Sequence, residues 1–336
     1  MTDAARNPEP AQKLKFYQKD TFAAGNRPVG ETDRAAQASN GRTDAIACRH
    51  GASPGCGEAL AARHVVRAAM RATNGNLIVV DATGGLEEFS APNVESAWQA
   101  AWVHSLFGNA ASVASGVAAA ILRIKGRGEM HVLAQIGDGG TASFGWLSAM
   151  FERNDDVLIV GYDSEGHANG CGQRSSATPP ATSDPVGEEG GNLFAAGRSV
   201  CRTALARGIP YVASASVADL RDLERKVAKA MSFHGARTIH VHAPCPLGSG
   251  AASRDTIRLA RLAVESGIFP LFEAEHGAIT GSRKIRHRVP VGEYLKPQKR
   301  YAQLLKMDNQ PDIVRLQEMA DRNIAEFDLL ASEENS

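Results

Sequence analysis

Short apolar runs that alternate with helix-like stretches are the feature that most constrains how this chain of 336 residues folds. Continuous apolar runs are typical of parallel strands, because the helices of βαβ units cover such strands on both faces. The runs span residues 77–81, 131–136, 157–162, 210–214 and 237–242. The sequence therefore predicts an α/β fold built on a doubly wound parallel sheet.

The alternating pattern also suggests how the chain is divided. Residues 1–46 are polar and lack periodicity, which indicates an arm rather than a domain, and residues 47–275 carry the alternating pattern. Residues 276–336 contain a basic, proline-containing segment and an amphipathic stretch, and we expect them to form an extension that contacts partner subunits. Helices are expected at 57–73, 109–125, 140–153, 191–207, 217–232, 253–267 and 311–330.

Charge and hydropathy exclude several classes of protein. Basic and acidic residues both number 37, so the basic excess of a nucleic-acid-binding protein is missing. No apolar stretch reaches the ~18 residues of a membrane span, and the polar start MTDAARNPEP lacks the apolar core of a secretory signal. We therefore expect a cytoplasmic protein, and its five cysteines do not indicate a disulfide framework.

Four polar or glycine-rich loops follow predicted strands, which is where ligands bind in a doubly wound sheet. In GDGG (137–140), Asp138 can hold a divalent cation while the glycines let a diphosphate approach the backbone, although a helix cap in a tight turn is the alternative. One βαβ unit later, DSEG (163–166) offers a hydroxyl and a carbonyl to Mg²⁺. This pairing resembles the magnesium signature of thiamine-diphosphate folds, with Ser164 in place of the usual asparagine. The other two loops are ATGG (82–85) and HAPCPLGSG (242–250).

Eight stretches in the same order make the chain similar to the thiamine-diphosphate-binding β subunit of 2-oxoacid:acceptor oxidoreductases, the pyruvate:ferredoxin oxidoreductase family. They cover roughly residues 50–305. They are PGCGEALA (54–61), DATGGLEEF (81–89), AWVHSLFGNAASVASG (101–116), IGDGGTASFG (136–145), YDSEGHANGCGQRSSATP (162–179), GIPYVASASV (208–217), IHVHAPCPLG (239–248) and VGEYLKPQKRY (291–301). The resemblance implies that residues 47–275 form the diphosphate half of a thiamine-diphosphate-binding fold.

The resemblance also implies a role for individual residues. Mg²⁺ is expected to be bound by the Asp138 carboxylate, the Ser164 side chain and the Gly166 carbonyl. Asn169 matches the residue that faces substrate and thiazolium, and Glu58 matches a glutamate close to the cofactor. A left-handed loop position for Asn169 and a first-turn helix carboxylate for Glu58 are the structural alternatives. The residues expected to line the cofactor are Thr83, Gly84, Gly137, Gly139 and Gly140.

His167 lies in the predicted substrate loop, two residues before Asn169. It is a candidate for binding or polarising the substrate, and an exposed loop histidine is the alternative. The family's loop has the pattern N-T-G-x-Q, whereas this chain has NGCGQ (169–173). Without the threonine side chain and with an extra glycine, the loop leaves room for a 2-oxoacid larger than pyruvate, such as the aryl acid phenylglyoxylate.

The cysteines depart from the family pattern. The family's β subunit binds one [4Fe–4S] cluster through four thiolates, and here Ser53 and Gly85 occupy two of those four positions. Two other loop cysteines restore the count that a cubane cluster needs. The predicted ligands are Cys56 and Cys245 at family positions, with Cys48 and Cys171 as replacements. A lost cluster or an unusual ligand set is the alternative.

The function implied by the resemblance is oxidative decarboxylation of a 2-oxoacid to acyl-CoA and CO₂. The implied partners are a pyrimidine-half α subunit, a γ subunit and a ferredoxin-like subunit, together with the 2-oxoacid and CoA, and the final acceptor is either ferredoxin or NAD⁺. A non-oxidative thiamine-diphosphate-dependent decarboxylase or carboligase is the alternative. The GDGG and DSEG loops argue against a non-enzymatic scaffold.

Overall fold

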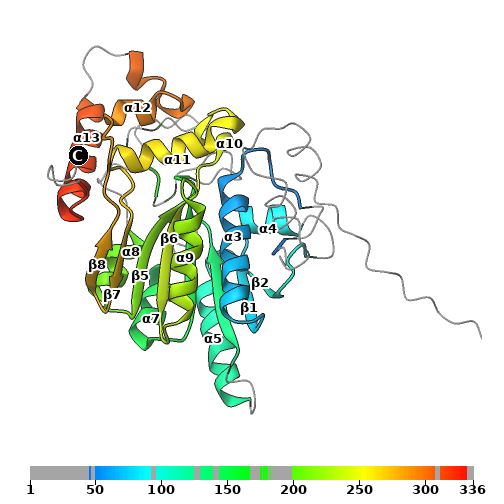
Figure 1. The fold of residues 1–336 in the computed structure, drawn as a ribbon. Helices are drawn as coiled ribbons and strands as arrows, with labels where there is room; N and C mark the ends of the chain where they lie inside the picture. The colour runs from blue at the N-terminus through cyan, green and yellow to red at the C-terminus, as the bar shows by residue number, and fades with distance from the viewer. Residues whose placement is uncertain are drawn as a thin grey trace, which may run out of the picture. The chain divides into compact units, whose positions relative to one another are not determined.

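A computed structural model of the chain describes residues 45–46, 50–91, 96–124, 129–138, 144–166, 175, 177–180, 182, 199–306 and 311–330. Its centre is an eight-stranded sheet with the strand order β2-β1-β3-β4-β6-β5-β7-β8 (Figure 1). The strands are β1 (Leu77–Ala82), β2 (Ala101–Ser105), β3 (His131–Ile136), β4 (Leu158–Asp163), β5 (Tyr211–Ser216), β6 (Arg237–His242), β7 (Phe272–Glu275) and β8 (Ala278–Ser282).

The six strands from β2 to β5 in this order are parallel, which confirms the predicted doubly wound sheet. Three further strands were not predicted. β2 is an edge strand with mostly exposed side chains, so it has no apolar run to reveal it. β7 and β8 form an antiparallel hairpin on the other edge, and its turn passes through His276 and Gly277 with φ of 49° and 82°. Positive φ at both positions is typical of the tightest hairpin turns.

Helices cover both faces of the sheet (Figure 1). One face is covered by α3 (Gly57–Ala72), α4 (Gly85–Ser90) and α9 (Leu220–Met231), and the other by α5 (Ala110–Arg123), α7 (Phe144–Arg153) and α8 (Val200–Ala206). Neighbouring strand residues alternate between the two cores, as Val79 and Val80 do in β1. Because both sets of side chains are buried, the inner strands are continuous apolar runs in the sequence.

A third core cluster joins the C-terminal part of the described chain. It contains buried side chains of α11 (Thr256–Glu265), α12 (Val291–Leu295) and α13 (Pro311–Glu326), among them Tyr294 and, beyond α12, Tyr301. The short helix α10 (Pro246–Ser249) precedes them, and 3₁₀ turns lie at Ser253–Asp255, Lys299–Tyr301 and Leu304–Lys306. Partner contact by residues 276–336 stays a prediction, as does the arm at 1–46, most of which lies outside the described residues.

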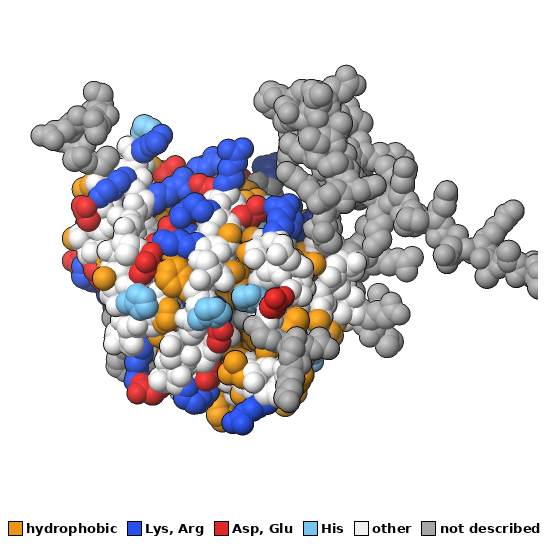
Figure 2. All heavy atoms as spheres, turned by 60° about the horizontal axis from the view of Figure 1, so that its bottom comes forward, with side chains coloured by type: hydrophobic (Ala, Val, Ile, Leu, Met, Phe, Trp, Pro, Cys, Tyr) orange, Lys and Arg blue, Asp and Glu red, His pale blue; other side chains and the backbone are white. Residues whose placement is uncertain are grey.

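The surface of the described part of the molecule shows no single dominant charge on the face turned forward in Figure 2. Lys, Arg, Asp, Glu and apolar side chains lie side by side there, in keeping with equal numbers of basic and acidic residues. Within the described ranges, none of the helices combines the length and the hydropathy of a membrane span.

Candidate active site

The topology of the sheet brings two of the predicted loops to one point. The chain leaves β1 toward β2 on one side, whereas it leaves β3 toward β4 on the other side. The crevice between the carboxyl ends of such strands is where doubly wound sheets bind ligands. Thr83 and Gly84 follow β1, and Gly137 and Asp138 follow β3. Four predicted cofactor residues therefore flank this crevice.

The three predicted magnesium ligands lie together. The Asp138 carboxylate accepts hydrogen bonds from the Ser164 amide (3.2 Å), the Ser164 hydroxyl (2.8 Å) and the Gly166 amide (2.9 Å). The Ser164 hydroxyl also lies 3.0 Å from the Gly166 carbonyl oxygen. A carboxylate, a hydroxyl and a carbonyl thus converge as hard oxygen donors of the kind that Mg²⁺ prefers. Asp138 is almost fully buried, so this arrangement is an internal one.

Three carboxyl groups are buried at this turn. Burial raises the pKa of Asp138 to about 6, and hydrogen bonds from Gly166 and Ser164 offset only part of the rise. Burial and the charges of Asp138 and Glu165 raise the pKa of Asp163 well above its usual range. Burial is the largest single influence on Glu165 too, but the charges of Arg300 and His242 and the hydrogen bonds from Tyr294 and Arg300 together outweigh it and hold the pKa of Glu165 below its usual value. The turn therefore carries more acid than base, an environment that favours a cation.

Glu58 lies beside Gly137, the first residue of the GDGG loop. It stands in the first turn of α3, and its Oε1 is 3.4 Å from the place that a Cβ on Gly137 would take. Burial, with Asp138 and Asp81 nearby, raises the pKa of Glu58 to about 8, so this carboxyl is protonated at neutral pH. Gly57 allows the approach of α3, because a Cβ there would stand 2.6 Å from the Pro244 carbonyl oxygen.

A row of polar side chains crosses four strands beneath the site, and all but the half-buried Trp102 are buried. Trp102 on β2 and Gln135 on β3 donate hydrogen bonds to the Asp81 carboxylate on β1, at 3.0 and 2.9 Å. Tyr162 on β4 donates its hydroxyl hydrogen to Gln135. Burial raises the pKa of Asp81 to about 6, although the Gln135 and Trp102 hydrogen bonds oppose the rise. The row connects the strands that carry the cofactor loops.

The raised pKa of Asp81 leads to a prediction about stability. The folded chain keeps the Asp81 proton up to about pH 6, whereas the unfolded chain releases it near pH 3.8. Stability from this group is therefore present below pH 3.8 and is lost as pH rises to about 6, by about 3 kcal/mol in total. Asp81→Asn should remove this loss, as measured by denaturant unfolding at pH 4 and pH 7.

The control for this prediction is Asp328→Asn, since the Asp328 side chain is 87% exposed. The quantity to compare is the difference in unfolding free energy between wild type and each variant as a function of pH. A difference for Asp81→Asn that stays constant across this interval would contradict the prediction.

Cys56 and Cys245 lie at the ends of two short connections beside this site. The Cys56 sulfur caps α3 by accepting a hydrogen bond from the Ala59 amide at 3.4 Å, and Cys245 immediately precedes α10. Burial raises the pKa of Cys56 to about 12, with Glu58 and Cys245 adding to the rise, and burial also raises the pKa of Cys245. The thiols are thus within electrostatic reach of each other, and a metal has to displace their protons.

Several predicted residues lie outside the part of the chain that the structure describes. They are Cys48, Gly139, Gly140, His167, Asn169 and Cys171. Among the described residues, no three His, Cys, Asp or Glu side chains form a group that could hold a metal ion. An iron–sulfur cluster therefore needs ligands beyond Cys56 and Cys245, and a magnesium site at Asp138 relies on hydroxyl and carbonyl oxygens.

On the other side of the crevice, Thr83 and Gly84 follow β1. Thr83 is fixed by contacts to β2, whereas Gly84 has open space beside its backbone within the described structure. The Thr83 hydroxyl lies 3.1 Å from His104 Nε2 and 3.2 Å from the Ser105 carbonyl oxygen, so it ties β1 to β2. Gly84 has φ of 144°, and a Cβ built on it would meet nothing within 4 Å. Among the described residues, nothing therefore occupies the space beside the backbone of this loop at Gly84.

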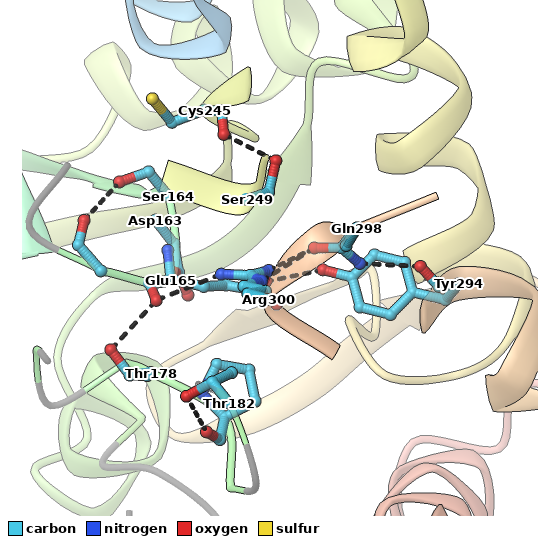
Figure 3. A network of polar contacts seen from close by, with 12 residues as sticks. Asp163, Ser164, Glu165, Thr178, Thr182, Cys245, Ser249, Tyr294, Gln298 and Arg300 are labelled. Carbon is cyan, nitrogen blue, oxygen red and sulfur yellow. Dashed lines mark hydrogen bonds and ion pairs between the residues drawn. The ribbon is translucent and has the colours of Figure 1, made fainter. Parts of the chain in front are cut away.

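One group of residues at the DSEG turn was not identified from the sequence. Glu165 contacts Tyr294 and Arg300, which come from the C-terminal segment (Figure 3). The matched stretches YDSEG and VGEYLKPQKRY contain these residues, but no spacing rule links them. Only the folded chain brings them together.

Comparison with known proteins gives three kinds of match. The family model "Thiamine pyrophosphate enzyme, C-terminal TPP binding domain" matches residues 83–241. The pyruvate synthase subunit PorB of Methanosarcina barkeri is 39% identical over 290 residues, covering 84% of this chain and 97% of that protein. PorB of Methanocaldococcus jannaschii is 40% identical over 291 residues, covering 83% and 95%.

Two more matches broaden the comparison. The ketoisovalerate oxidoreductase subunit VorB of Pyrococcus abyssi is 37% identical over 270 residues, covering 77% of this chain and 86% of that protein. The solved 2-oxoglutarate:ferredoxin oxidoreductase from Magnetococcus marinus, with 2-oxoglutarate, coenzyme A and succinyl-CoA bound, aligns with a TM-score of 0.51. It is 20% identical and the alignment covers 63% of this chain and 77% of that chain, so it supports the fold alone.

Proposed function

The chain belongs to the family of thiamine-diphosphate-binding β subunits of 2-oxoacid oxidoreductases, and we propose that it provides the diphosphate half of the active site for oxidative decarboxylation of a 2-oxoacid to acyl-CoA. The observation that carries this proposal is the Asp138 carboxylate held by Ser164 and Gly166 at the switch point of the sheet. In the overall reaction, the 2-oxoacid and CoA give acyl-CoA, CO₂, one proton and two electrons.

The residues around Asp138 fit thiamine diphosphate and Mg²⁺. Asp138, Ser164 and Gly166 supply oxygen donors to the cation, and the cation in turn would bind the diphosphate. When bound, thiamine diphosphate supplies the nucleophilic carbon and the electron sink for decarboxylation. Glu58 offers a protonated carboxyl next to Gly137, suited to donating a hydrogen bond to a negatively charged or developing anionic group.

Two predicted residues complete the proposed substrate site. We assign contact with the substrate and thiazolium to Asn169, and binding or polarisation of the substrate to His167. Sequence identity to the relatives does not indicate which 2-oxoacid is the substrate. A relative named for pyruvate is 40% identical to this chain, and one named for ketoisovalerate is 37% identical. The NGCGQ loop (169–173) supports a 2-oxoacid larger than pyruvate, with phenylglyoxylate as our candidate. Comparison of acyl-CoA formation from the two acids tests the choice.

The proposed electron exit is a [4Fe–4S] cluster bound by Cys56, Cys245, Cys48 and Cys171. The first two stand beside α3 and α10 and within electrostatic reach of each other. From the cluster, electrons would pass to a ferredoxin-like subunit and then to ferredoxin or NAD⁺. Iron content and visible absorption of the native complex test whether the cluster is present.

A non-oxidative decarboxylase or carboligase is the second candidate function. It is favoured by Ser53 and Gly85, which stand where the family has two cysteine ligands. Such an enzyme needs no cluster, so the two candidates differ in iron content. Purified complex with bound thiamine diphosphate but without iron would favour the second candidate.

We predict that this chain is inactive without its partners, an α subunit carrying the pyrimidine half and a γ subunit. The described fold contains one sheet with one switch-point crevice, and the matched family model is a single thiamine-pyrophosphate-binding domain. The tagged chain alone should not reduce a viologen dye with any 2-oxoacid, whereas the complex purified on the same tag should. Turnover by the isolated chain would contradict the prediction.

A further inference from the structure

The DSEG turn has an unusual backbone at its centre. Glu165 has φ of 63°, in the left-handed region that side chains with a Cβ rarely adopt. Its neighbours on both sides, Ser164 and Gly166, are the residues that donate hydrogen bonds to Asp138. A left-handed residue persists only where its surroundings hold it, so something must hold Glu165.

Buried groups contact both the side-chain carboxylate and the backbone carbonyl of Glu165 (Figure 3). Its carboxylate forms an ion pair with Arg300 and accepts a hydrogen bond from the Tyr294 hydroxyl at 2.7 Å. Its carbonyl oxygen accepts hydrogen bonds from the Thr178 hydroxyl at 3.0 Å and from Arg300 Nη1 at 3.4 Å. Arg300 therefore contacts both the side chain and the backbone of this one residue.

Arg300 is itself fixed in place. Its Nε donates to Gln298 Oε1 at 2.9 Å, while Gln298 Nε2 donates to the Tyr294 carbonyl oxygen at 2.7 Å. The side chain lies over the Tyr301 ring, 5.2 Å from its centroid. Arg300, Gln298 and Tyr294 are all buried, with 9%, 2% and 2% of their surface exposed. The planar guanidinium makes these contacts simultaneously, which a lysine ammonium at one point would not do.

We propose that Arg300 is a positioning residue for the cofactor's cation. By fixing Glu165, it holds Ser164 and Gly166 where both can hydrogen-bond to the Asp138 carboxylate. The inference rests on the proposed function, because it assumes that Asp138, Ser164 and Gly166 bind Mg²⁺. The segment Val291–Tyr301 thereby becomes part of the cofactor site. Its two side chains that contact Glu165, Tyr294 and Arg300, lie 129 and 135 residues further along the chain. Without Arg300, Glu165 relaxes toward negative φ and moves the Gly166 amide and carbonyl away from Asp138.

The test measures thiamine diphosphate binding as a function of Mg²⁺ concentration in the complex purified on a tag on this chain. Arg300→Ala should weaken Mg²⁺-dependent binding by about 10- to 100-fold, the range for removal of groups that orient metal ligands. Tyr294→Phe deletes one hydroxyl and should give a smaller loss in the same direction. Arg288→Ala is the matched control, because Arg288 lies just before that segment and pairs with Asp321 on the surface.

A second-site variant separates positioning from general damage. Glycine adopts φ of 63° without the steric cost of a Cβ and carries no carboxylate to leave unpaired. Arg300→Ala combined with Glu165→Gly should therefore recover Mg²⁺ affinity relative to Arg300→Ala alone. Circular dichroism and the thermal midpoint report whether each variant is folded.

The outcomes distinguish this inference from the proposed function. If the wild-type complex binds thiamine diphosphate without needing Mg²⁺, or does not bind it, the proposed function itself fails. If the wild type binds normally and folded Arg300→Ala has an unchanged Mg²⁺ dependence, the positioning role is overturned. If Arg300→Ala does not fold, Tyr294→Phe decides, and an unchanged Mg²⁺ dependence in that variant overturns the role.

Discussion

Asp138→Ala should abolish Mg²⁺-dependent retention of thiamine diphosphate while the chain still folds. At an effective dielectric of about 20, a carboxylate and a dication about 4 Å apart attract each other by about 8 kcal/mol before desolvation. Even if desolvation cancels most of this attraction, the remaining few kcal/mol correspond to a loss of affinity of about 100-fold or more. Equilibrium dialysis of thiamine diphosphate across a Mg²⁺ series measures the effect.

The structure also predicts why the fold survives this change. Alanine removes no core volume of consequence, but it leaves the Ser164 and Gly166 amides without their acceptor. Two unmet hydrogen bonds of this kind cost about 1–3 kcal/mol each, which lowers the thermal midpoint without unfolding a typical domain. Asp138→Asn keeps an oxygen acceptor and loses the charge, so it should retain the midpoint and lose the cation. Normal thiamine diphosphate affinity in folded Asp138→Ala would refute the magnesium role.

The sequence was informative where the fold buries strands on both faces. The runs at β1, β3, β4, β5 and β6 are apolar for this reason, and each was identified close to its observed bounds. β2 escaped detection because Ala101, Val103 and His104 are exposed at the edge of the sheet. An edge strand that is partly exposed to solvent has a residue composition similar to that of a loop, so its sequence does not reveal it.

The site shows the same limit in another form. Asp138, Ser164 and Gly166 each follow a predicted strand, so the sequence placed them correctly at one end of the sheet, while their role as magnesium ligands stays a prediction. Their support by Arg300 was not identified, since the ion pair joins residues 135 positions apart and follows no periodic pattern. The row through Asp81 and Gln135 was hidden for a different reason. Each polar residue lies within a run that is otherwise apolar, and only the strand register makes them neighbours.

Serine replacements in the native complex test the proposed cluster ligands one cysteine at a time. Cys56→Ser and Cys245→Ser should each remove the proposed iron–sulfur cluster, because a cubane needs four thiolates and these two are among the four proposed. Cys201→Ser is the matched control, since Cys201 is buried in α8 and its thiol donates to the Ala213 carbonyl oxygen. Iron per chain and the reduced-state EPR signal measure the result.

Replacing Cys48 and Cys171 separates the two interpretations of these cysteines most clearly, because the two predict opposite iron contents for Cys171→Ser. If Cys171 is the ligand that replaces the cysteine missing at Gly85, then Cys171→Ser should lose the iron and EPR signal of one cluster, and Cys48→Ser should do the same. If Cys171 instead shapes access to the substrate, Cys171→Ser should keep full iron content and change the ratio of rates with phenylglyoxylate and pyruvate. The second outcome would refute the proposed ligand set. A ligand of the cluster and a side chain that shapes the substrate pocket are two different roles, so iron content and substrate preference distinguish them.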